Sequence, residues 1–339
     1  MKIIAEILSI VILLAGMASC AKTDRIYGNP QKEIAMNPVM HSMTKAEVPG
    51  PVTGSQYPDA EHFGVIAYYS PLFTDGQKWT SLTSVQPYFE NREFAKEGDT
   101  FSGSPKCYWP HQGSLVFAGY SPFDAEKESV TFDPVEKTLT ITGFESYEQT
   151  DLMYFLPTLS NSGNYVGTLD KSNSVSAQFF HALSLISFEI KADPLDDGRV
   201  TLKTVTLKNA NTKGDFSATC VSSSSAGTLS WKNQIKTSEY PVASSSLPTV
   251  LSSSSALATQ DLFVPGSNLT NSPVVEFKYE IAYNTVDGSG YVVNATKEET
   301  TSFTIEDYTE EWEAGKKYVY AVTIGLNRIE FENFTAEWR

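Results

Sequence analysis

The chain has 339 residues, with 25 Lys and Arg against 40 Asp and Glu, and its formal net charge is −15 at pH 7. That length suits two domains of about 150 residues, each able to bury a core without disulfides. The acidic balance argues against a nucleic-acid partner, because neutralising phosphates requires a basic surface. No apolar run approaches the roughly 20 residues of a membrane-spanning helix.

The first 19 residues have the organisation of an export signal. Lys2 supplies a positive start, Ile7 to Ala15 form a short apolar core, and Ser19 directly precedes Cys20. Small residues followed by Cys resemble a bacterial lipobox, in which a peptidase cuts before a lipidated cysteine. An ordinary signal peptide with an incidental cysteine is the alternative. We expect residues 1–19 to be removed, Cys20 to carry lipid, and the protein to be exported.

Residues 20–54 have the polar, proline-containing composition of a tether. Within this segment Ile34, Met36 and Met40 recur at even spacing between other residues. A period of two is typical of a β-strand with one buried face. The sequence therefore predicts a lipidated tether that contains one short strand.

The remainder of the chain consists of short segments in which β-branched and aromatic residues recur at period two. In chain order these segments are 62–70, 113–122, 138–146, 151–157, 174–192, 199–210, 273–285 and 316–332. The polar stretch 160–174 is predicted to be a linker. No amphipathic helical pattern of 12 residues occurs. We therefore predict an all-β protein with two β-sandwich domains in series, at 55–172 and 173–339.

The chain lacks the sequence motifs of common catalytic, phosphate-binding and zinc sites. Its 4 histidines are scattered, and His181, which Phe180 and Ala182 flank, is expected to be a half-buried structural residue. A pair of carboxylates for glycoside hydrolysis stays open, because such a pair is defined in space rather than by spacing. We expect no enzyme activity, no metal and no cofactor.

Cys107 and Cys220 lie in different predicted domains. An export compartment would permit a disulfide between them. Lone cysteines far apart in the chain more often pack as small apolar side chains. We expect both to be buried thiols.

Four short sequence motifs follow one another along nearly the whole exported chain. They are CYWPHQGSLVFAGYSP from Cys107, DLMYF from Asp151, FFHALSLISFEIK from Phe179, and YVYAVTIGLNRIEF from Tyr318 with the terminal Trp338. Together they resemble the fimbrillin family, the lipoprotein-derived subunits of type V pili of Gram-negative anaerobes. The resemblance implies two transthyretin-like Greek-key β-sandwich domains, a surface-exposed outer-membrane lipoprotein, and assembly into a fimbria by strand exchange.

In that family a protease cuts after Arg or Lys in the N-terminal segment and removes the first strand. The open groove then accepts a strand from a neighbouring subunit. Carried onto this chain, the resemblance places the removable strand at about Glu33 to Met43, with the three apolar residues named above pointing inward. The cut would follow Lys45. Arg25 is the alternative, but it precedes the strand, so cutting there would free the lipid and leave the groove filled.

The C-terminal tail is the preferred donor strand. One face of this stretch has apolar residues at even positions, whereas Ile329 and Phe331 occupy odd ones; the even positions are Tyr318, Tyr320, Val322, Ile324 and Leu326. Such a change of phase indicates a bulge or a new strand. Ile329, Phe331 and Trp338 supply large apolar groups for donation. The alternative is an ordinary closing strand of the second sandwich.

The leading hypothesis is a structural pilus subunit. Its partners would be other pilus subunits, identical or paralogous, and the outer membrane through lipid on Cys20. The alternative is a tip adhesin or surface lipoprotein that binds glycan or host protein. Its candidate aromatic residues are Tyr68, Tyr69, Trp79 and Trp231, each of which also suits a core position.

Overall fold

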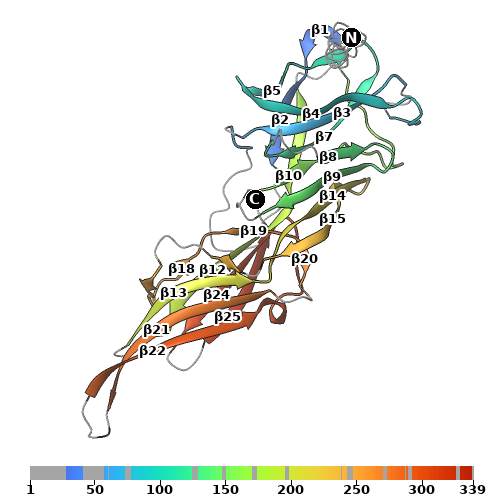
Figure 1. The fold of residues 1–339 in the computed structure, drawn as a ribbon. Coiled ribbons are helices and arrows are strands. Elements are labelled where there is room, and N and C mark those ends of the chain that lie inside the picture. Colours follow the sequence, from blue (N-terminus) through green and yellow to red (C-terminus); the bar gives the residue numbers. More distant parts are fainter. Residues whose placement is uncertain are drawn as a thin grey trace, which may run out of the picture.

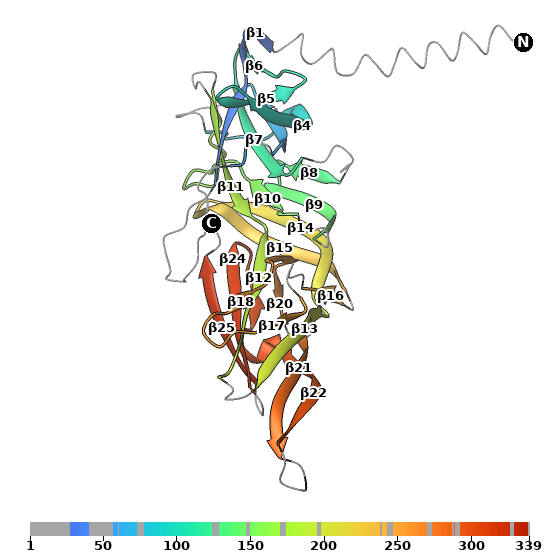
Figure 2. The same ribbon diagram turned by 90° about the vertical axis from the view of Figure 1, so that its left-hand side faces the viewer.

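The computed structural model describes residues 28–40, 57–59, 61–72, 78–123, 129–146, 150–169, 174–194, 198–237, 239–242, 247–269, 273–286, 288, 292–325 and 329–337. Regular structure in these residues is β-strand apart from one short 3-10 helix, Ile305–Asp307, which confirms the all-β class. The molecule is elongated, with the early strands at one end and the late strands at the other (Figures 1 and 2). No helix in the described ranges is long and apolar enough to cross a membrane.

Seven strands close into a barrel at the N-terminal end of the molecule (Figure 1). In order around the barrel they are β10 (Met153–Phe155), β11 (Val175–His181), β2 (Ala35–Met40), β5 (Thr100–Ser104), β4 (Gln86–Glu97), β3 (Phe63–Ser70) and β7 (Ser114–Ser121). A two-stranded sheet of β1 (Gly28–Glu33) and β6 (Tyr108–Pro110) lies at the same end (Figure 2). Closure pairs strand edges that would otherwise be exposed.

A four-stranded sheet covers one side of the barrel. Its strands are β15 (Ser224–Lys236), β14 (Asn211–Val221), β9 (Thr138–Glu145) and β8 (Val130–Asp133), in that order. Leu139, Ile141 and Phe216 of this sheet share a buried cluster with Ile66 and Val116 of the barrel. Strand β7 is covered on one face by the barrel core and on the other by this sheet, which explains why every one of its residues is buried.

The C-terminal end is a sandwich of two sheets (Figure 1). One sheet contains β12 (Leu183–Ala192), β24 (Lys316–Ile324) and β25 (Ile329–Glu337), with β18 (Leu257–Ala258) and β19 (Leu262–Pro265) on β12. The other contains β13 (Arg199–Lys208), β21 (Val274–Val286) and β22 (Val292–Thr304), with β16 (Tyr240–Pro241) and β17 (Thr249–Val250) on β13. A pair of short strands, β20 (Ser267–Asn268) and β23 (Glu311–Trp312), lies beside them. Inward residues of both sheets form one core that includes Phe188, Phe277 and Tyr320.

Strand pairing does not divide the chain at residues 172 and 173, where we expected the domain boundary. Strand β11 follows that boundary yet belongs to the barrel, and the β14–β15 hairpin of the second half pairs with β9 of the first. The described part of 160–174 is not a free linker either. Tyr165 is 1% exposed, with its ring 5.5 Å from that of Trp79, and Thr168 forms a bridge to Leu115. Polar composition indicated irregular backbone, and this backbone nevertheless packs on the barrel.

The transthyretin-like description of the two units stays a prediction.

The period-two pattern located several strands closely. Segments 62–70, 113–122, 138–146, 199–210 and 273–285 correspond to β3, β7, β9, β13 and β21. Segment 174–192 is two strands, β11 and β12, which meet at Ala182. The change of phase after Tyr318–Ile324 is the boundary between β24 and β25. Strands β4, β15 and β22 were missed, because their polar and exposed positions hide the pattern.

Cys107 and Cys220 are buried free thiols that belong to two different cores, so they form no disulfide with each other. Burial raises the pKa of the Cys220 thiol to about 12.

We therefore expect the native protein to protect Cys220 from N-ethylmaleimide at pH 9. The thiolate is the reactive form, and with a pKa of about 12 roughly one thiol in a thousand is ionised at that pH. Mass spectrometry of the peptide after labelling measures the modification, and the protein unfolded in guanidinium is the positive control. Complete labelling of native Cys220 within minutes would contradict its burial.

Candidate functional site

Strand β2 forms the seam that closes the barrel. It runs parallel to β11, with residue pairs from Met36 and Val175 to Met40 and Phe179. On its other side it pairs antiparallel with β5 at only two positions, Ala35 and Met36. Because it belongs to the N-terminal segment and joins two strands from later in the chain, the barrel closes only when this segment is present.

The inward face of the seam is apolar. Ile34 and Met36 are 0% exposed, Pro38 is buried, and Met40 is partly buried against the same core. Asn37, between them, is exposed. These side chains therefore alternate as a strand with one core face requires.

The core beneath the seam is aromatic. The Tyr57 and Phe179 rings lie 5.0 Å apart, and Phe63 lies 5.4 Å from Phe101 and 5.3 Å from Phe179. The Tyr57 hydroxyl lies 2.7 Å from Ser121 Oγ, and burial raises the pKa of Tyr57 above its ordinary value. Removal of the seam would uncover this cluster. Sequence patterns did not reveal Tyr57, because it lies outside any strand.

Polar contacts hold the segment that leads into the seam. The Ile34 amide donates to the Cys107 carbonyl at 2.8 Å. The Lys106 ammonium lies 2.9 Å from Glu33 Oε1 and also pairs with Glu97. Hydrogen bonds to Glu97 and then Glu33 raise the pKa of Lys106. The Lys106 ion pairs are partly exposed to solvent, so burial of the apolar seam contributes more than these pairs to holding the strand.

The tail expected to act as donor lies within the chain's own sandwich. Strand β25 pairs antiparallel with β24 from Lys316 and Glu337 to Ile324 and Ile329. It is an edge strand of its sheet. Phe331 is 7% exposed, and its ring stacks 4.8 Å from Phe303. Ile329 is partly buried in the same core.

Four further residues of the expected site lie outside the described residues and have no structural account: Cys20, Arg25, Lys45 and Trp338. The structure thus describes residues 33–40 of the strand predicted to be removable and residues 329–337 of the predicted donor, and it does not bring them together. Strand β2 belongs to the barrel and β25 to the sandwich at the other end.

The aromatic residues considered for adhesion mostly lie in cores. Tyr69 and Trp79 are each 1% exposed, whereas Tyr68 and Trp231 are half-buried. His181 is buried, as expected of a structural residue, and its Nδ1 lies 3.0 Å from Asp151 Oδ2. Within the described ranges, no three His, Cys, Asp or Glu residues are grouped to hold a metal ion.

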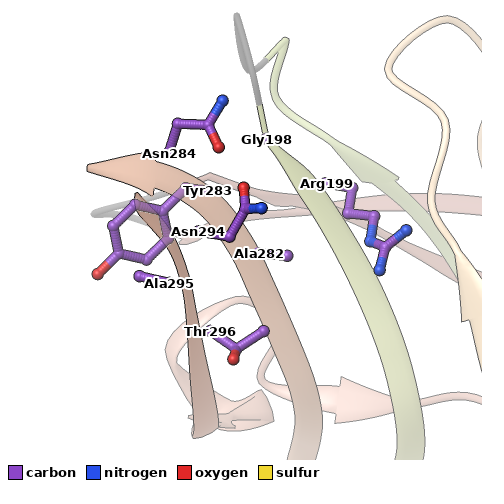
Figure 3. Close-up of a pocket in the computed structure, with 8 residues that line it drawn as sticks. All are labelled: Gly198, Arg199, Ala282, Tyr283, Asn284, Asn294, Ala295 and Thr296. Atoms are coloured by element: carbon purple, nitrogen blue, oxygen red, sulfur yellow. The ribbon is translucent and has the colours of Figure 1, made fainter. Parts of the chain in front are cut away.

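A hollow of about 460 Å³ lies over β13, β21 and β22 at the far end of the sandwich. Figure 3 shows the Arg199 guanidinium and the Tyr283 ring pointing to opposite sides of the sheet. Asn284 and Asn294, which face each other across β21 and β22, also line it. The charged and aromatic groups do not converge on one ligand.

These features define an all-β protein with a barrel closed by its own N-terminal strand. A family model described as fimbrillin-like matches residues 51–338. The chain therefore belongs to the fimbrillin-like family, and as a fimbrillin-like protein it is not an enzyme.

A solved structure of a fimbrial protein shares the fold. A fimbrial protein from Bacteroides vulgatus ATCC 8482 is 17% identical, with 90% of this chain and 99% of that chain covered and a TM-score of 0.53. The tip fimbrial protein Mfa3 from Porphyromonas gingivalis, with a C-terminal truncation, is 8% identical, with coverage of 82% and 94% and a TM-score of 0.37. No curated protein matches the chain.

Proposed function

We propose that the protein is a subunit of a cell-surface pilus that assembles by strand exchange through the barrel seam. The observation that supports this most directly is the position of β2, which fills a slot between β5 and β11 over an aromatic core. A strand held between two others can be replaced by a strand from a second subunit, because the new strand restores both the backbone pairing and the apolar burial.

Cleavage after Lys45 would release the whole seam, since β2 ends at Met40. Cleavage after Arg25 would leave both β1 and β2 attached to the barrel, since β1 begins at Gly28. Lys45 is therefore the processing site that we propose. The test is a heat-resistant ladder on a denaturing gel after cleavage, because strand-exchanged polymers unfold slowly.

The donor that we propose is the tail that carries Ile329, Phe331 and Trp338. Among the described strands β25 is an edge strand whose one partner is β24, so it can leave its sheet while the other strands keep their partners. Its phenylalanine and isoleucine would enter the slot that Ile34, Met36 and Met40 vacate.

A tip or anchor role is the second candidate. In this alternative the tail stays in its own sandwich, where Phe331 is already buried. The subunit would then accept a strand without donating one, and partners of an adhesin would be a glycan or a host protein. A cleaved chain that forms only one-to-one complexes with another pilus subunit would favour this role.

Export as an outer-membrane lipoprotein is part of the proposal. We expect Cys20→Ala to abolish both lipid attachment and membrane retention, because the thiol is the acceptor for the lipid. Metabolic labelling with a fatty-acid probe, followed by membrane fractionation, measures this. Cys107→Ala is the matched control and should keep the label. Label that survives in the Cys20→Ala protein would refute the assignment.

A further inference from the structure

A groove lies where the sheet covering the barrel meets the short strands of the sandwich. It consists of two hollows of about 420 and 160 Å³ that share Ser267 and Asn268 of β20. The larger hollow is also lined by Trp231 of β15 and by Glu311 and Glu313 of β23 and the residues after it. The smaller one is lined by the amides Asn209, Asn211 and Gln234 and by Lys236. We call this surface the junction groove.

The aromatic wall of the junction groove is rigid. The Trp231 indole Nε1 donates to the Ala182 carbonyl at 3.0 Å, and the rings of Phe216 and Phe144 lie 5.2 and 6.0 Å away. A Cβ added at Gly266 would lie 3.1 Å from the Trp312 carbonyl oxygen and 3.8 Å from Trp231 Cδ1, so Gly266 lies between the β23 backbone and the edge of the indole. A half-buried, immobilised indole is a preorganised surface for an apolar face of a ligand.

The polar groups along the groove are partly fixed and partly available. Asn211 Nδ2 donates to Gln234 Oε1 at 3.1 Å, and Gln234 Nε2 donates to the Gly266 carbonyl at 2.9 Å. These two hydrogen bonds orient the side chains of Asn211 and Gln234 and leave the side-chain oxygen of Asn211, Oδ1, as an acceptor. The Glu311 carboxylate and the Ser267 hydroxyl have no side-chain partner within the part of the chain that the structure describes. The neighbouring Glu313 pairs with Lys316.

We propose that the junction groove binds a neutral oligosaccharide. A sugar ring has an apolar C–H face that suits the indole and hydroxyl groups that suit amides and carboxylates. The two hollows adjoin at Ser267 and Asn268, which favours a ligand of more than one sugar unit. A ligand without negative charge is favoured because the two carboxylates of Glu311 and Glu313 outnumber the single ammonium of Lys236 along the groove, and the whole chain carries a charge of −15.

This binding does not depend on strand exchange. The junction groove is made by β15, β20 and β23 and by the residues around them, none of which belongs to the seam. Polymerisation and sugar binding are therefore separable, and failure of either leaves the other open to its own measurement.

The experiment is binding of the purified full chain to a printed array of neutral and sialylated glycans, followed by calorimetric titration with a bound neutral glycan. Three variants are compared. Glu311→Ala removes an exposed hydrogen-bond acceptor, Trp231→Leu keeps apolar bulk without the aromatic face, and Glu310→Ala is the matched control, because it removes a neighbouring carboxylate that does not line the groove.

We expect neutral glycans to bind and each groove variant to weaken binding by about tenfold, the loss of roughly one hydrogen bond or stacking contact. The Glu310→Ala control should bind within about twofold of the parent. The exposed position of Glu311 keeps the test valid if Trp231→Leu fails to fold. Absence of glycan binding, preference for sialylated glycans, or unchanged affinity in Glu311→Ala would overturn the proposal. Failure of the same sugar, free in solution, to displace the bound glycan would also overturn it.

Discussion

Cleavage after Lys45 is expected to make the chain polymerise. The cut removes β2, and with it Ile34 and Met36, which are 0% exposed, as well as the partly buried Met40. Each large apolar side chain stabilises the barrel by about 1.5–3 kcal/mol when buried. The opened barrel also exposes backbone groups of β5 and β11 that paired with β2. A strand from a second subunit restores both kinds of contact, so association follows.

The measurement uses a specific protease site inserted after Lys45, with samples run on denaturing gels with and without heating. A site inserted after Arg25 is the matched control, because its cleavage leaves β1 and β2 in place and should give no ladder. A chain that ends at Arg328 tests the donor, since it lacks β25, which begins at Ile329. Equal ladders from the two cleavage sites would show that β2 does not block assembly. Equal ladders with and without the tail would refute the tail as donor.

Phe331→Ala is expected to destabilise the uncleaved protein by about 3–5 kcal/mol, the usual cost of removing a buried phenylalanine. The Phe331 ring is 7% exposed and lies 4.5 Å from Tyr308, 4.8 Å from Phe303 and 5.2 Å from Tyr320. Its loss leaves a cavity at the edge of the sandwich core. Urea denaturation followed by tryptophan fluorescence measures the change in the free energy of unfolding.

Glu332→Ala is the control on the same strand, because Glu332 is exposed and surface changes cost less than about 0.5 kcal/mol. In the cleaved protein, Phe331→Ala should also slow polymerisation, since the same ring would fill the acceptor slot. A stability loss below about 1 kcal/mol would mean that the strand does not pack as β25. Unchanged polymerisation would mean that Phe331 is not the residue donated.

Much of the local structure follows from residue order. In β13, Val200 and Leu202 occupy even positions whereas Val205 and Leu207 occupy odd ones, and all four are buried. The pairing of β13 with β21 shifts register between Leu202 and Thr204. A change of phase in the sequence thus marked a bulge in the strand. The same argument separated β24 from β25, and the alternation of Ile34 and Met36 indicated β2.

The sequence by itself determined the all-β class, the position of most apolar strands and the apolar face of the seam, because side chains alternate at period two whatever a strand pairs with. Only the tertiary structure decided the partners. That Met36 lies beside Val175, and Phe216 beside Ile141, depends on contacts between distant parts of the chain, which a local pattern does not encode. The junction groove has the same origin, since Trp231, Ser267 and Glu311 come from three separate strands that only folding brings together.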